Sequence, residues 1–325
     1  MGYKYKDVRK GVYRDGHQRE DVIQYRQMVF LPILRVLGNR IVHWEMVVTP
    51  NGETLQPMYL ANLPAGVRPI VLIGYDETTF NPHDGRNEVR IKEDYTLLKQ
   101  KSRGRGIMVS DFLVPGGRLQ VPSGTIIPSL LQYEASDNCL HHLETQFTTC
   151  SIQYGGENWW DGDKRVEQVL KIGIPIFETA FPGCEALFLF DNATSHSAYA
   201  SNALRASAMN LCPGGEQVAL RSGQNSLTNE IQVLVMADRI PKGLRMILEE
   251  RGLWRARLRL QCCKENGNLK KQCLSVGTCC ARALMANERD FKAQPSRLEE
   301  EVEFVGHQVH FFPKYHCKLN FIEYY

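Results

Sequence analysis

Two aspartates follow apolar segments of the kind that form buried strands. Residues 69–76 (PIVLIGYD) end on Asp76, and residues 186–191 (ALFLFD) end on Asp191. Because ligands gather at strand ends in α/β sheets, the two carboxylates are candidates for a shared site. Carboxylate oxygens suit Mg²⁺, and a pair of such ions can cleave a phosphodiester bond. Taken alone, however, aspartates in these positions are more often turn-forming residues at strand ends.

The residues around these aspartates favour the functional interpretation. Three short blocks resemble, in order, the blocks around the catalytic carboxylates of mariner-like transposases of the DDE superfamily: residues 76–80 (DETTF), 191–196 (DNATSH) and 319–323 (LNFIE). Residues 14–22, 104–112 and 248–254 are similar to segments of large transposase-like proteins of fungal genomes, so the likeness covers nearly the whole chain. Two features depart from the compact family pattern: 132 residues separate Asp191 from Glu323, and Phe321 replaces a proline.

The resemblance implies a site and a reaction. Asp76, Asp191 and Glu323 would hold two Mg²⁺ or Mn²⁺ ions, and an activated water would cleave DNA before the freed 3′-hydroxyl attacks target DNA. The supporting residues would be Glu77, Asn192 and His196. Strand alternation puts Glu77 on the face opposite Asp76, so Asp76 is the better ligand.

The resemblance also implies an α/β fold: an RNase H-like mixed five-stranded sheet flanked by helices, with a long insertion before the last strand. The expected parts are an N-terminal helical segment (1–65), the first part of the core (66–209), an insertion with a cysteine-rich stretch (210–305), and a last strand with a truncated catalytic helix (306–325). The chain ends two residues after Glu323, and a helix that short would support a ligand poorly. The alternative is therefore a catalytically inactive, transposase-derived protein that binds DNA or another partner.

Hydrophobic periodicity predicts the elements that would position these residues. A helix begins near Asp21 and ends near Pro32, and the region from Thr49 to Pro69 is a loop. Predicted strands cover 69–76, 88–92 and 106–114 as an antiparallel meander, then 186–191 and 308–313. Residues 115–160 are expected to be irregular. Predicted helices cover residues 163–172, 198–209, 243–251, 281–286 and 296–305.

DNA would be the partner, at transposon ends and at the target, and a homodimer and a nuclear location follow from the same resemblance. The net charge of +3 does not itself indicate a nucleic-acid partner, so local basic groups would have to contact phosphates. The candidates are Lys99, Lys101, Arg103 and Arg105, and a second group, Arg255, Arg257 and Arg259, which would share one face of an extended segment. Solvated surface is the alternative for both. No apolar run approaches the roughly 20 residues that cross a bilayer, so no membrane partner is expected.

Ten cysteines occur without an N-terminal signal-peptide core, which favours a reducing compartment with thiols or metal ligands. Five of them are dense enough to suggest a structural Zn²⁺ site: Cys262, Cys263, Cys273, Cys279 and Cys280. No Cys-x-x-Cys pair is present, so buried free thiols are the alternative.

Overall fold

The computed structural model describes residues 3–4, 16–50, 52–82, 91–92, 105–125, 146–154, 159–192, 198–262 and 277–324. The chain divides into two compact units. Unit 1 combines Met1–Ala198 with Leu298–Tyr325, and unit 2 is Tyr199–Arg297. The insertion predicted at 210–305 overlaps unit 2.

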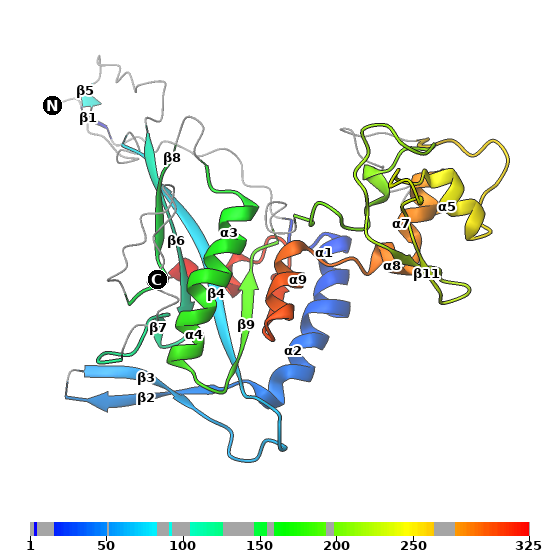
Figure 1. Ribbon diagram of the computed structural model, residues 1–325. Coiled ribbons are helices and arrows are strands. Elements are labelled where there is room, and N and C mark those ends of the chain that lie inside the picture. The colour runs from blue at the N-terminus through cyan, green and yellow to red at the C-terminus, as the bar shows by residue number, and fades with distance from the viewer. Residues whose placement is uncertain are drawn as a thin grey trace. The chain divides into compact units, whose positions relative to one another are not determined.

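Unit 1 is built on a mixed sheet (Figure 1). Its strands are β4 (Ile70–Phe80), β6 (Gly106–Val114), the two-residue β7 (Gly117–Arg118), β8 (Cys150–Tyr154), β9 (Glu185–Phe190) and β12 (Gln308–Phe311). β6 pairs antiparallel with β4, β7 and β8, whereas β9 runs parallel to β4 and to β12. The α/β class is therefore confirmed, with six strands where five were expected.

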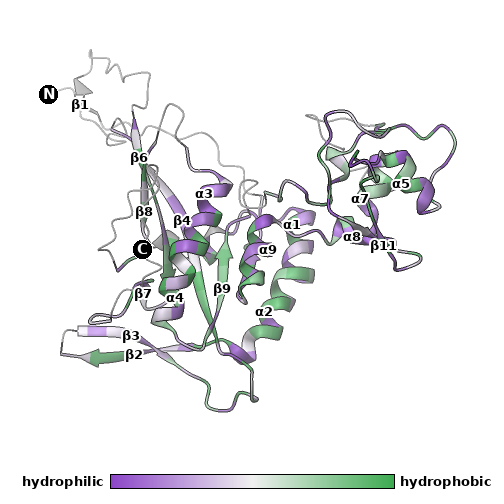
Figure 2. Ribbon diagram, viewed as in Figure 1, coloured by the Kyte–Doolittle hydropathy of each residue, from purple (hydrophilic) through white to green (hydrophobic). Residues whose placement is uncertain are grey.

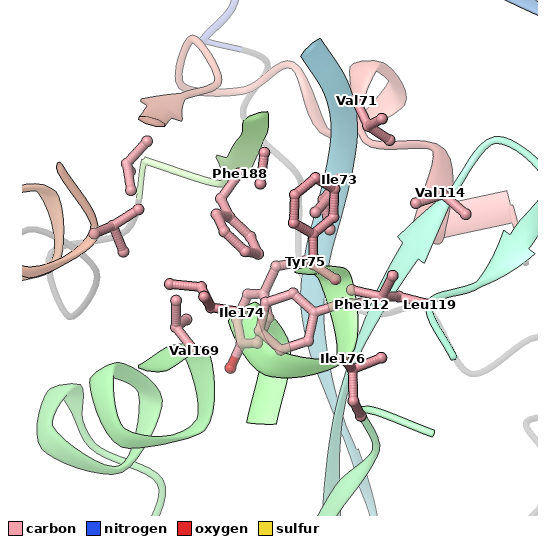
Figure 3. Packing of buried hydrophobic residues seen from close by; sticks show 14 of the residues in the cluster. Val71, Ile73, Tyr75, Phe112, Val114, Leu119, Val169, Ile174, Ile176 and Phe188 are labelled. Atoms are coloured by element: carbon pink, nitrogen blue, oxygen red, sulfur yellow. The ribbon is translucent and has the colours of Figure 1, made fainter. Parts of the chain in front are cut away.

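One face of the sheet is covered by a long helical segment made of α3 (Gly162–Gln168), a π-helical stretch (Val169–Gly173) and α4 (Ile174–Ala180). The apolar core lies beneath it, and Figure 3 shows the rings of Tyr75, Phe112 and Phe188 gathered between β4 and the helical residues. The Tyr75 and Phe112 ring centroids are 4.9 Å apart. Leu298 and Val302 of α9 (Arg297–Phe304) join the same core.

The other face carries α1 (Glu20–Tyr25), a π-helical stretch (Arg26–Phe30) and α2 (Leu31–Leu37). Phe30 and Leu37 pack there against alternate residues of the strands, among them Ile70, Leu187 and Leu189. Since β9 is buried on both faces, it is apolar along most of its length (Figure 2).

The prediction that the first helix ends at Pro32 is wrong, because a π-turn lets the helix pass the proline. Leu31 N–H bonds to the carbonyl of Arg26, five residues back. The long helical segment from α3 to α4 has the same kind of π-turn before Pro175, where Ile174 N–H bonds to the carbonyl of Val169. A proline ring clashes with the carbonyl four residues earlier and offers no N–H. Because each proline is preceded by this wider π-turn, the helix can continue past the proline.

Several predicted strands also need correction. β4 does not end at Asp76 but continues to Phe80, because its last residues pair with residues 107–111 of β6. The third antiparallel strand is β8, from the region predicted to be irregular, where Cys150 and Ile152 alternate into the core. Of the strand predicted at 88–92, only β5 (Ile91–Lys92) is described, and it pairs with β1 (Tyr3–Lys4) outside this sheet. The region predicted as a helical segment (1–65) and a loop also contains a β-hairpin that was not predicted. It is formed by β2 (His43–Thr49) and β3 (Gly52–Met58).

Unit 2 has its own apolar core, formed around α5 (Leu244–Glu250), α7 (Ala281–Asn287) and α8 (Arg289–Lys292). A short hairpin joins β10 (Gly223–Gln224) to β11 (Ile231–Gln232). Arg251 is fully buried and pairs with Glu288 at 2.9 Å and Asp290 at 2.7 Å.

The helix predicted at 198–209 is reduced to a 3₁₀ turn at Ala206–Ala208. Backbone groups upstream of this turn bond to other segments instead: Leu204 N–H donates to Gln294, and the Asn202 carbonyl accepts from Arg221 N–H. Tertiary contacts therefore override the helix propensity of the alanines. Among the described residues of the whole chain, no helix is long and apolar enough to span a membrane.

Candidate active site

Asp76 lies within β4, and Asp191 directly follows β9, the parallel strand paired with β4. In the register of β4 and β9, Gly74 lies opposite Leu189, and each aspartate follows two residues later in its own segment. Because side chains alternate with a period of two, Asp76 belongs to the face that carries Leu187 and Leu189. If the chain stayed extended after β9, Asp191 would belong to that face too. Asp76 is half-buried within β4, and Asp191 is exposed directly after β9 ends.

A third carboxylate, which the sequence analysis missed, lies beside Asp76. Asp111 of β6 lies directly opposite Asp76 in the antiparallel register, on the same face. Its oxygens accept hydrogen bonds from Arg118 Nε at 2.9 Å, Thr148 Oγ1 at 2.7 Å and Thr149 Oγ1 at 2.8 Å. Like charges directly opposite each other repel. Arg118 and the two hydroxyls offset this repulsion on the Asp111 side.

Arg118 is itself held in place from two sides. Its guanidinium carbon lies 4.2 Å from the centre of the Phe147 ring, and its side chain also bonds to Thr149. About a third of the Arg118 side chain stays exposed (31%). A fixed, partly exposed guanidinium beside carboxylates can bind a phosphate oxygen.

The segment that carries Glu323 rests on β4 next to Asp76. Asn320 is almost completely buried, and its Nδ2 donates to the carbonyl of Tyr75 at 3.0 Å. A Cβ atom added to Gly74 would lie 2.9 Å from Asn320 Oδ1 and 3.0 Å from the Phe321 ring. Gly74 thus gives the C-terminal segment room to approach the sheet, on the face that Asp76 shares.

Two 3₁₀ helices form this C-terminal segment, Cys317–Leu319 and Phe321–Tyr324. The backbone of Glu323 belongs to the second one, where the sequence predicted a truncated catalytic helix. The Glu323 side chain lies outside the described part of the chain, so its role as a ligand stays a prediction.

Glu77 lies on the opposite face, as alternation predicts. Its carboxylate pairs with the buried Arg165 of α3 at 3.1 Å, and its backbone N–H donates to Asp76 Oδ1 at 2.8 Å. Beside it, burial raises the pKa of the Tyr75 phenol far above its ordinary value, and its hydroxyl accepts from Trp160 Nε1 at 2.9 Å. The Glu77–Arg165 pair and the buried Tyr75 therefore support β4 from this face. Asn192 is half-buried beside Asp191, and His196 lies outside the described residues.

The predicted basic residues are only partly described. Lys99, Lys101 and Arg103 lie outside the described residues, and Arg105 is exposed just before β6. Arg255, Arg257 and Arg259 are exposed in unit 2. The prediction that these three share a face of an extended segment is wrong, because Arg257 adopts a left-handed backbone (φ 61°) in a turn.

Three of the five predicted zinc ligands come together. The Sγ atoms of Cys262, Cys279 and Cys280 all lie within 4.8 Å of one another. Cys263 and Cys273 lie outside the described residues. Cys150 is disulfide-bonded, so the expectation that all cysteines are thiols or metal ligands is wrong for this residue.

No family model, curated protein or solved structure matches the chain.

Proposed function

We propose that this chain is the catalytic core of a DDE-type transposase, a metal-dependent enzyme that cleaves DNA and transfers the cut strand. The observation that carries the proposal is that Asp76 lies on β4 and Asp191 directly follows β9, the parallel strand paired with β4. The segment that includes Glu323 packs against β4 at Gly74, on the face that Asp76 shares. These are the residues of the three sequence blocks that resemble the family, although 115 and 132 residues separate them along the chain.

The architecture supports an RNase H-like fold as the finer description of this α/β unit. Its sheet is mixed and has helices on both faces. Unit 2 is inserted between β9 and β12, which agrees with the long insertion before the last strand.

The donor set fits Mg²⁺ or Mn²⁺, since both aspartates offer hard carboxylate oxygens on a rigid sheet. Two such ions would supply an activated water and would stabilise the leaving oxygen of a phosphodiester. Asp76 is held within β4 and accepts a hydrogen bond from Glu77 N–H, which fixes its carboxylate. Asp191 is exposed, so a DNA strand can reach it. Arg118 would contact a DNA phosphate beside the carboxylates.

The proposed partner is DNA, at transposon ends and at a target, and the proposed location is the nucleus. A homodimer belongs to the same proposal. These assignments rest on the resemblance in the sequence.

The test is nicking of supercoiled plasmid DNA by the full chain with Mg²⁺ or Mn²⁺. We expect nicking by the wild type, its loss in Asp76→Asn and Asp191→Asn, and its retention in Asp163→Asn, which changes an exposed aspartate of α3. Plasmids with and without terminal inverted repeats separate a transposase from a nuclease without end preference. Wild-type protein that never nicks DNA with either ion would reject the enzymatic proposal.

A second candidate is a transposase-derived protein that binds DNA without cleaving it. One observation favours it: Glu323 stands on a four-residue 3₁₀ helix, whereas metal ligands need rigid support. In the same assay this candidate predicts a DNA mobility shift and no metal-dependent nicking.

A further inference from the structure

Unit 2 contains a compact cluster of three cysteine sulfurs. The Sγ atoms of Cys262, Cys279 and Cys280 lie within 4.8 Å of one another, and those of Cys279 and Cys280 are 4.0 Å apart. In a tetrahedral zinc site the Zn–S bonds of about 2.3 Å put neighbouring sulfurs roughly 3.8 Å apart. The cluster therefore already has nearly the spacing of three corners of such a site.

Backbone hydrogen bonds hold the two halves of the cluster together. Ala281 N–H donates to the Arg259 carbonyl at 2.9 Å, and Arg282 N–H donates to the Leu260 carbonyl at 3.2 Å. The Arg282 side chain adds a bond to Gln261 Oε1 at 2.6 Å. The segment that ends in Cys262 is thus fixed along the start of α7, where Cys279 and Cys280 lie. Protein contacts, and not the cysteines alone, bring the three sulfurs together.

The buried and charged surroundings also suit a metal thiolate site. Cys280 is fully buried at the start of α7, and the next residue, Ala281, is buried in the core of unit 2. Cys262 and Cys279 are exposed, so an ion can enter from solvent. Three thiolates around Zn²⁺ leave one net negative charge. Arg282 bonds to Gln261, and Arg255 donates to the Thr278 carbonyl at 2.6 Å, so each guanidinium bonds to the residue before a cysteine of the cluster.

We propose that Cys262, Cys279 and Cys280 form a zinc site in unit 2, with one coordination position left for a further donor. Soft thiolate ligands select Zn²⁺ over the Mg²⁺ or Mn²⁺ proposed for the aspartates, so the two sites take different ions. The ion ties residue 262 to residues 279–280 and closes the chain between them, which stabilises the folded unit. This role is independent of DNA cleavage.

The test measures the metal content of the full chain, purified without added metal and passed through a weak chelator. We expect one zinc per chain in the wild type, and loss of that zinc in Cys262→Ser and in Cys279→Ser. Cys212→Ser is the matched control, because Cys212 is a free, exposed cysteine of the same unit, and it should retain the zinc. Both substitutions in the cluster affect exposed side chains, so the fold of the protein should tolerate them.

A second measurement uses only the wild type and does not depend on the folding of variants. Replacement of the metal by Co²⁺ should give the thiolate-to-cobalt charge-transfer absorption of a sulfur-ligated tetrahedral site. The proposal is overturned if the wild type retains no zinc and shows no such absorption. It is equally overturned if Cys279→Ser binds zinc as the wild type does, or if mass spectrometry finds a disulfide within the cluster of the freshly purified protein.

Discussion

Asp76 and Asp111 lie opposite each other on one face of the sheet, and Asp191 directly follows the neighbouring strand β9. The three carboxylates have different surroundings. Asp111 is neutralised by Arg118 and two threonine hydroxyls. Asp76 is its cross-strand neighbour, and Asp191 follows the end of β9, the strand on the other side of β4. A cation bound between Asp76 and Asp191 would balance their charge as Arg118 balances that of Asp111. We therefore propose that Asp76 and Asp191 are the ligands and that Asp111 positions Arg118.

Arg118 should contribute to DNA binding through a phosphate contact. We expect Arg118→Ala to weaken binding, and to lower the slope of log K against log salt by about 0.9, the value for one lost phosphate contact on duplex DNA. The measurement is a salt titration of binding to a fluorescent duplex. Arg35→Ala, which removes an exposed arginine of α2, is the control. An unchanged slope in Arg118→Ala would remove Arg118 from the interface.

Two buried histidines, His307 and His310, are expected to make the stability of the protein depend on pH. His310 stacks on Phe30 with ring centroids 5.1 Å apart, and burial lowers its pKa from 6.5. Burial likewise lowers the pKa of His307, although the nearby Glu178 acts in the opposite direction. In the unfolded chain each histidine takes up a proton near pH 6.5, before the folded protein can. The stabilisation is therefore complete above pH 6.5 and is lost as the pH falls toward the lower folded pKa.

We predict that urea unfolding midpoints fall between about pH 7.5 and about pH 5.5, and that His310→Phe reduces this fall. Phenylalanine can keep the stacking on Phe30 and cannot titrate. His43→Phe is the control, because His43 lies exposed at the start of β2. If the His310→Phe and wild-type midpoints fall in parallel, His310 is not one of the groups responsible.

At the scale of elements, the site depends on how the C-terminal segment meets β4. Asn320 and Phe321 fill the space over Gly74, and Asn320 bonds to the Tyr75 carbonyl. The support for Glu323 therefore comes from contacts with the sheet, since the 3₁₀ helix around it has only four residues.

Gly74→Ala tests this contact. The added Cβ would lie 2.9 Å from Asn320 Oδ1, so the C-terminal segment must move away from the sheet. We expect a loss of unfolding free energy of about 1–3 kcal/mol, typical of overpacking, and a larger loss of nicking activity. Gly38→Ala is the matched control, because a Cβ at Gly38 meets nothing within 4 Å. Nicking at the wild-type rate in Gly74→Ala would show that the placement of this segment does not matter for cleavage.

The hydrophobic pattern of the sequence predicts some helices and strands correctly and fails for others, for physical reasons. The apolar runs of β4, β6, β9 and β12 were recognised because these strands are buried on one or both faces. The strand β8 was missed because its partner β6 lies far away in sequence and supplies the pairing that makes Ser151 and Gln153 part of a sheet. The helix through Pro32 was missed because a π-turn leaves no signal in the periodicity.

At the scale of the whole molecule, the chain holds two sets of candidate metal ligands of different chemistry. Unit 1 carries hard carboxylates on a mixed sheet, and unit 2 carries soft sulfurs beside α7. Asp76 and Asp191 could be predicted from the sequence because each follows an apolar run and begins a recognisable block. The sequence did not predict the roles of Asp111, Arg118 and Asn320, since these roles arise from strand register and from contacts between distant segments.

We propose that Asp76 and Asp191 together bind the ions that cleave DNA. The most direct test is the metal preference of Asp191→Cys in the nicking assay, because a thiolate binds Mg²⁺ poorly and accepts the softer Mn²⁺ more readily. We predict that Asp191→Cys loses nicking with Mg²⁺ and regains part of it with Mn²⁺, while Asp163→Cys behaves as the wild type with both ions. Nicking by Asp191→Cys with Mg²⁺ at the wild-type rate would show that Asp191 does not bind the ions used in cleavage.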